Sequence, residues 1–203
     1  MNRGIVLMIA AWLWVVLPAR SAWAHAGGLG DGIDDPLVAG FVHPILGLDH
    51  LLAMVSVGVI SAMIGGRAIW LVPLTFLGAM AGGALAAQSF LLVTPSVVEG
   101  AIAASVVLLG IAIALERQIP IQITFGFVAF FGFFHGFAHG VETPAWANPV
   151  AFGIGFLLGS TLIHLQGVLI GGIAMRFPSW QPVVRVAGAG FVLIGVLTLT
   201  GLV

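Results

Sequence analysis

The segment Phe41-Val-His-Pro-Ile-Leu-Gly-Leu-Asp-His-Leu-Leu-Ala-Met54 places two histidines and an aspartate inside an otherwise apolar run of membrane-spanning length. Ionisable side chains are costly in hydrocarbon, so within a membrane span they usually face a bundle interior or a water-filled cavity. His43, Gly47 and His50 have the spacing i, i+4 and i+7, which puts them on one helical face. Asp49 lies about 100° round from His50, where it could join the site or orient a histidine. The alternative is a neutral histidine pair bonded to neighbouring helices, with Asp49 as its structural partner.

The composition places the whole chain in a membrane. Of its 203 residues, 61% are hydrophobic and 6% are charged, whereas a soluble domain carries about a quarter charged residues. These values predict an all-α integral membrane protein. Because the chain has no cysteine, any metal ion must be held by nitrogen and oxygen. The net charge of −1 and the absence of a basic cluster argue against nucleic acid as a partner.

The N-terminus has the pattern of a signal peptide. Arg3 precedes an apolar run over residues 5–17, and Ala22-Trp23-Ala24 matches a small-residue cleavage site. We expect residues 1–24 to be removed, although an uncleaved first transmembrane helix is the alternative. Cleavage would make His25 the first residue, and its amine and imidazole could chelate Ni²⁺ or Cu²⁺. The alternative for His25 is a disordered end.

Six hydrophobic segments follow, and we expect them to form a six-transmembrane-helix bundle that makes up a single domain over residues 25–203. The predicted spans are about 37–64, 69–92, 97–115, 120–141, 148–175 and 182–202. Short loops predict antiparallel neighbours. In the first span, Pro44 leaves the Gly40 carbonyl without its helical hydrogen bond, so the helix should begin or bend there.

Charge placement predicts the orientation of the bundle. With the mature N-terminus outside, all four arginines of the membrane domain fall in or next to the cytoplasmic loops, as the positive-inside rule expects: Arg67, Arg117, Arg176 and Arg185. Both termini would then be periplasmic, in a multi-pass protein of the bacterial inner membrane. Glycine pairs with the small-xxx-small spacing predict close helix packing: Gly78/Gly82, Gly132/Gly136/Gly140, Gly155/Gly159 and Gly167/Gly171.

A second polar cluster ends the fourth predicted span. His135, His139 and Glu142 have the spacing i, i+4 and i+7 and so share a face. Two histidines one turn apart can bind a single metal ion, and a carboxylate one turn further on adds a ligand or holds a histidine tautomer. Alternatively, Glu142 marks the membrane surface and the histidines make packing contacts.

Two further residues are candidates with open alternatives. His164 lies midway along the fifth predicted span, where it could be a deeper station on an ion path or a packed histidine bonded to Ser160. Glu99 opens the third span, where it could attract a cation or be a surface carboxylate stabilised by the helix dipole.

Two stretches of the sequence resemble the two hallmark motifs of the HupE/UreJ family: His43-Pro44-x-x-Gly47-x-Asp49-His50-Leu-Leu-Ala-Met54 and Phe134-His135-Gly136-x-Ala138-His139-Gly140-x-Glu142. The resemblance extends over the signal, the six spans and the overall length. It implies a nickel permease, or a cobalt permease as in some members, with an accessory function for hydrogenase or urease.

The residue patterns predict a polar metal site inside the bundle, and together with what the resemblance implies they lead us to expect a non-enzymatic, ATP-independent permease for Ni²⁺ (Co²⁺ is less favoured) with no prosthetic group. The central site would use His43, Asp49, His50, His135 and His139, with Glu142 and Glu99 at its outer mouth and His164 further in. Partners would be the ion, the lipid bilayer, possible further copies of the chain, and metallochaperones for hydrogenase or urease maturation. The rivals are a zinc-dependent intramembrane hydrolase and a membrane metal sensor or storage protein.

Overall fold

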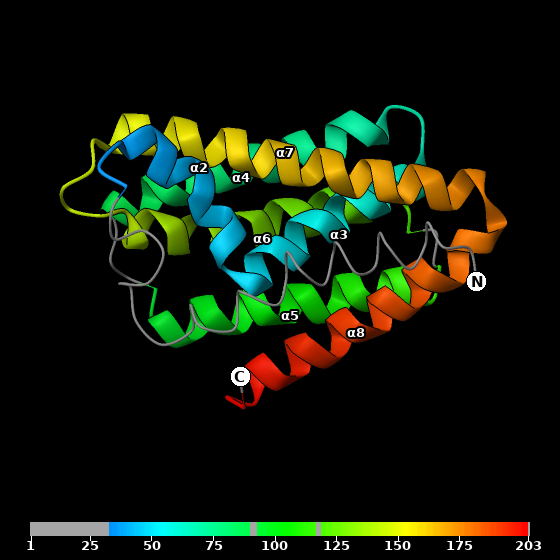
Figure 1. Cartoon of the computed structure of the whole chain (residues 1–203). Helices are drawn as coiled ribbons and strands as arrows, with labels where there is room; N and C mark the ends of the chain where they lie inside the picture. Colours follow the sequence, from blue (N-terminus) through cyan, green and yellow to red (C-terminus); the bar gives the residue numbers. More distant parts are fainter. Residues whose placement is uncertain (1–32, 90–92, 117–118, 203) are drawn as a thin grey trace.

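The described part of the chain forms a bundle of long apolar helices (Figure 1). The computed structural model describes residues 33–89, 93–116 and 119–202, so the predicted signal peptide and His25 lie outside the described residues. The helices are α2 (Pro36–Leu46), α3 (Leu48–Ile64), α4 (Ala68–Ser89), α5 (Pro95–Ala114), α6 (Ile121–Glu142), α7 (Pro149–Arg176) and α8 (Gln181–Leu199), with a short 3-10 turn, η2 (Pro178–Trp180), before α8.

The helix starts follow from local sequence. The side chain of Asp35 accepts hydrogen bonds from the backbone N–H groups of Leu37 and Val38, and Pro36 occupies the first turn. Asn148 caps α7 in the same way ahead of Pro149. A side-chain oxygen at the cap satisfies otherwise unpaired N–H groups, and proline loses nothing at a position that needs no N–H.

The first predicted span is broken rather than straight. α2 and α3 meet at Gly47, where the axis bends by 81°. The backbone of Gly47 is extended (φ −83°, ψ 111°), three residues after Pro44. The bend therefore exists, but it lies at Gly47 and not at Pro44, because α2 continues through Pro44 to Leu46. The prediction that His43, Gly47 and His50 share one helical face is wrong, because the break at Gly47 puts the two histidines on different helices. His43 is in the last turn of α2, whereas Asp49 and His50 are in the first turn of α3.

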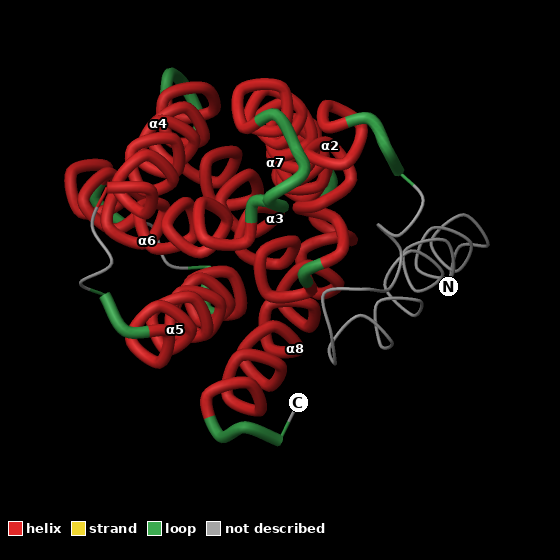
Figure 2. Tube along the Cα trace, turned by 90° about the vertical axis from the view of Figure 1, so that its left-hand side faces the viewer, coloured by secondary structure: helices red, strands yellow, loops and turns green. Residues whose placement is uncertain are grey.

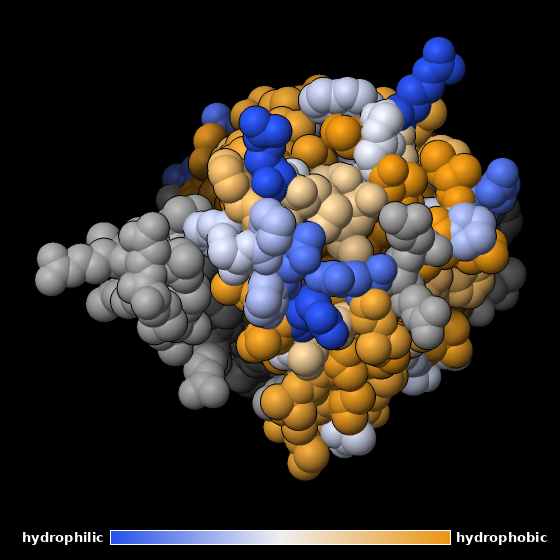
Figure 3. Space-filling model, turned by 90° about the vertical axis from the view of Figure 1, so that its right-hand side faces the viewer, coloured by the Kyte–Doolittle hydropathy of each residue, from blue (hydrophilic) through white to orange (hydrophobic). Residues whose placement is uncertain are grey.

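Among the described residues, five helices are long and apolar enough to cross a membrane, and the bent pair α2/α3 counts as a sixth span if its two halves cross together. The protein is thus an all-helical, multi-pass membrane bundle. Hydrophilic side chains gather at the end of the bundle where α7 ends and α8 begins, and apolar residues surround them (Figure 3). This distribution is the one expected where a membrane-spanning bundle emerges from the bilayer.

The most extensive helix pairs are not the ones joined by short loops. α4 packs mainly on α6, α7 packs on α2 and α3, and α5 packs on α8. α4 and α6 run parallel, because a Cβ on Gly132, Gly136 or Gly140 would meet successively later residues of α4. Viewed along the bundle, α3 lies in its middle (Figure 2), and every residue from His50 to Ser61 is buried. Antiparallel neighbours along the chain thus make the smaller contacts.

Most of the predicted glycine contacts occur, but one pair is wrong. A Cβ on Gly136 would come within 1.9 Å of the Met80 carbonyl oxygen, so only glycine permits this approach of α6 to α4. Gly78 and Gly82, by contrast, face outward with no neighbouring atom within 4 Å. α4 uses Gly83 instead, one residue further on, whose Cβ would meet the Phe133 carbonyl oxygen. The spacing was right for helix contact, but it could not identify the face.

Candidate metal site

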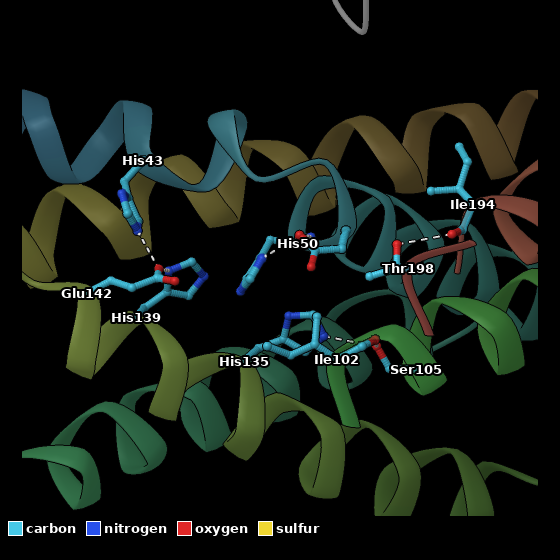
Figure 4. Close-up of polar contacts among 10 residues, drawn as sticks. His43, His50, Ile102, Ser105, His135, His139, Glu142, Ile194 and Thr198 are labelled. Carbon is cyan, nitrogen blue, oxygen red and sulfur yellow. Dashed lines mark hydrogen bonds and ion pairs between the residues drawn. The ribbon is translucent and has the colours of Figure 1, made fainter. Parts of the chain in front are cut away.

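Three ligand-type side chains meet at the end of the bundle where α2 begins and α6 ends. His43 donates a hydrogen bond from Nε2 to Oε2 of Glu142 at 3.1 Å (Figure 4). Nδ1 of His139 lies 3.3 Å from the same oxygen, within ion-pair distance but without hydrogen-bond alignment. One ligand atom from each of the three residues can be chosen so that all lie within 4.8 Å of one another. Among the described residues, this is the one such group of three.

His50 lies deeper and is oriented by its neighbour. Asp49 accepts a hydrogen bond from Nδ1 of His50 at 2.8 Å and another from the His50 backbone N–H at 2.9 Å. A carboxylate that accepts from one ring nitrogen leaves the lone pair of a neutral imidazole on the other. Nε2 of His50 is buried and has no hydrogen-bond partner among the described residues.

His135 is held by a residue that the sequence did not single out. Ser105 donates its hydroxyl hydrogen to the Ile102 carbonyl oxygen at 2.6 Å, and the Ser105 oxygen lies 3.0 Å from Nε2 of His135. The signal that could have found Ser105 is its position, because it is the one polar side chain between residues 101 and 114. Both Ser105 and His135 are completely buried.

The four histidines of the two motifs form a connected chain of rings. Ring centroids lie 4.9 Å apart for His43 and His139, 4.1 Å for His139 and His50, and 4.9 Å for His50 and His135. The two polar motifs, far apart in sequence, are thus brought face to face, with Glu142 at the more exposed end. Imidazole nitrogen and carboxylate oxygen are ligands suited to Ni²⁺, Co²⁺ and Zn²⁺.

His164 lies beyond this chain of rings. It donates from Nδ1 to the Ser160 carbonyl oxygen at 2.7 Å, which leaves Nε2 buried and without a partner among the described residues. Phe76 contacts both sides, with its ring centroid 5.4 Å from that of His135 and 5.3 Å from that of His164. His164 is therefore bonded to Ser160, as expected if it is a packed histidine. Its Nε2 has no hydrogen-bond partner among the described residues, and the Phe76 ring lies between it and His135.

Glu99 is not brought to the cluster. It is exposed near the start of α5, and no hydrogen bond or ion pair links it to a histidine within the described ranges. The dipole of the α5 N-terminus suffices to account for a carboxylate there.

Comparison with known proteins identifies the chain's relatives. The family model described as HupE / UreJ protein matches residues 13–198. Protein HupE of Rhizobium leguminosarum bv. viciae is 39% identical over 181 residues, which cover 89% of this chain and 91% of the relative. No solved structure matches. The matched region contains both polar motifs and every described helix except the last residue of α8, and the chain therefore belongs to the HupE/UreJ family.

Proposed function

We propose that this protein is a secondary permease that carries Ni²⁺ across the bacterial inner membrane into the cytoplasm. The observation that carries the proposal is the grouping of His43, His139 and Glu142 within 4.8 Å, next to buried histidines with unpartnered ring nitrogens. Buried polar atoms without partners are rare and call for a ligand, a water or a function. A row of such atoms inside a membrane bundle suits an ion path.

The geometry supports an ordered path. Glu142 has about half of its side chain exposed, so it would meet the hydrated ion first, together with His43. His139, His50 and His135 then offer buried imidazoles in the order of the ring contacts, and His164 would receive the ion beyond Phe76. Glu99 would act only at a distance, by attracting cations to the outer surface.

No ATP-binding motif is needed for uptake. A dication that crosses inward down a potential of about 100 mV gains roughly 4.6 kcal/mol, twice the value for a single charge. Family membership supports nickel as the ion, with a link to hydrogenase or urease maturation, and cobalt is the closest competitor because its ligand preferences are similar.

Purified protein in liposomes tests the proposal. With an inside-negative potential, wild-type protein should admit radiolabelled Ni²⁺, and His50→Ala should reduce the initial rate to near that of empty liposomes. Competition with Co²⁺ and Zn²⁺ then ranks the ions. Lipid hydrolysis without metal flux would favour the zinc-dependent hydrolase, and tight binding without flux would favour a sensor or storage protein. Ni²⁺ flux through His50→Ala at the wild-type rate would rule out the proposed site.

A further inference from the structure

We propose that the ion occupies two successive stations that share His139, and that Ser105 positions His135 in the inner station. This inference rests on the proposed function and deepens it. The outer station consists of His43, His139 and Glu142, and the inner station of His50 and His135 with His139 turned toward them.

The ligand atoms do not form one cluster. Ligand atoms of His43, His139 and Glu142 can all lie within 4.8 Å of one another. Within the described part of the chain, no group of three or more ligand residues that includes His50 or His135 meets this distance. One ion therefore cannot contact all of them at once without movement. The ring of His139 lies 4.9 Å from that of His43 and 4.1 Å from that of His50, so it is the member that reaches both groups.

His139 is also the one of these rings that no hydrogen bond to a described residue holds in place. Its Nδ1 is 3.3 Å from Glu142 without hydrogen-bond alignment, and neither ring nitrogen has a hydrogen-bond partner among the described residues. His50 and His135, by contrast, are each held through one ring nitrogen, by Asp49 and Ser105 respectively. Fixed inner ligands and a movable shared ligand suit the transfer of an ion by ligand exchange.

Ser105 determines which nitrogen His135 offers. A serine hydroxyl has one hydrogen, and Ser105 directs it to the Ile102 carbonyl oxygen at 2.6 Å. Turning that hydrogen toward His135 would leave two oxygens 2.6 Å apart with no hydrogen between them, which is repulsive. The Ser105 oxygen therefore accepts from Nε2–H of His135. The lone pair of the neutral ring then lies on Nδ1, which is buried and unpartnered.

The two stations differ chemically. The outer one combines a half-exposed carboxylate with two imidazoles, which suits capture of a hydrated dication. The inner one offers imidazole nitrogen alone, at side chains that are at least nine-tenths buried: His50, His135 and His139. Entry into it requires the ion to shed water, so it would discriminate against hard ions such as Mg²⁺ and Ca²⁺, which prefer oxygen ligands.

The experiment compares Ser105→Ala with Ser61→Ala. Ser61 is a matched control, because it is also completely buried and also donates to the carbonyl oxygen three residues earlier, at 2.7 Å. Within the described part of the chain, no histidine is hydrogen-bonded to its hydroxyl. Each variant is assayed for Ni²⁺ uptake in liposomes, for equilibrium Ni²⁺ binding in detergent and for melting temperature.

We expect Ser105→Ala to lower the maximal uptake rate about 10- to 100-fold, the usual cost of losing an outer-shell partner of a metal ligand. The equilibrium Kd for Ni²⁺ should stay close to the wild-type value, because the outer station is intact, and Ser61→Ala should resemble wild type in both. Glu142→Gln should instead weaken binding. Ser105→Thr, which keeps the hydroxyl, should recover much of the rate if it folds.

Three results would overturn the inference. Ser105→Ala could transport as well as Ser61→Ala, it could weaken equilibrium binding as much as Glu142→Gln, or both serine variants could lose rate and melting temperature equally. The first excludes a role for Ser105, the second indicates a single station, and the third indicates a packing role only. Wild-type liposomes that admit no Ni²⁺ would instead refute the proposed permease function itself.

Discussion

Substitution of Gly136 by alanine should separate two helices that the candidate site needs in contact. The added Cβ would lie 1.9 Å from the Met80 carbonyl oxygen and 2.5 Å from two further Met80 backbone atoms. Real Cβ contacts essentially never fall below 3.0 Å, so α6 must recede from α4 by about 1.1 Å. The obstructing atoms are backbone, and a change of rotamer cannot relieve the clash. His135, the adjacent residue, must move with the helix.

The expected energetic cost follows from overpacking. Forcing extra methylene volume into a packed interface typically costs about 1–3 kcal/mol, partly offset by the roughly 1 kcal/mol by which alanine exceeds glycine in helix propensity. For a domain of about 200 residues, each kcal/mol shifts the melting temperature by roughly 2–4 °C. We therefore expect the melting temperature of Gly136→Ala to fall by several degrees, and Ni²⁺ uptake to fall at least tenfold, because misplacement of about 1 Å is costly at a functional site.

Gly126→Ala is the matched control on the same helix. Gly126 is exposed and has no neighbouring atom within 4 Å, so its Cβ meets nothing. Only the helix-propensity term then applies, and the melting temperature should be unchanged or slightly higher. Both variants are compared in one detergent by thermal unfolding, and in liposomes by initial Ni²⁺ uptake. Equal melting temperatures and equal rates for the two would refute the α4–α6 packing described above.

Three further substitutions test separate features. Glu142→Gln removes the charge that two histidines contact, so the half-saturation concentration for Ni²⁺ uptake should rise about tenfold or more, at least the cost of losing a group that supports a metal ligand. An unchanged value would exclude Glu142 from ion capture. Gly47→Ala places a Cβ 3.0 Å from Nδ1 of His50, so uptake should fall several-fold while the protein remains folded, and a normal rate would show that the ring tolerates the displacement. Gly78→Ala and Gly82→Ala add Cβ atoms where nothing lies within 4 Å, so melting temperature and uptake should both stay at wild-type values. A loss at either position would show that this face of α4 packs on another helix, such as one from a second copy.

The composition and the spacing of polar residues were sufficient to predict the helical membrane bundle and the limits of its spans to within a few residues. α6, for example, was expected over 120–141 and extends over Ile121–Glu142. Such limits are properties of each segment alone, because the length of the apolar run belongs to that segment, and proline and cap residues act within one helix turn. The i, i+4, i+7 patterns likewise placed His135, His139 and Glu142 on one face before any partner helix was known.

The local sequence could not predict which helices pack against each other. A small-xxx-small pattern marks a helix that can be approached closely, but every face of a membrane helix is apolar, so hydrophobicity cannot show which face is covered. Gly78 and Gly82 have that spacing and face outward, whereas Gly83 makes the contact. Ser105 stands out in the sequence only as the one polar side chain between residues 101 and 114. A single hydroxyl in a span acquires meaning only when a histidine 30 residues away in sequence lies 3.0 Å from it.

By itself, the sequence determined that the chain is a multi-span membrane protein with two polar motifs, since ionisable groups in apolar segments stand out wherever the chain folds. Only the tertiary structure decided how those motifs combine. The 81° bend at Gly47 puts His43 and His50 on two different helices. α6 brings Glu142 to His43, His135 to His50, and His139 to both. The physical reason is that ligand identity is carried by the residue, whereas ligand grouping depends on helix crossings that glycine contacts set to within about an ångström.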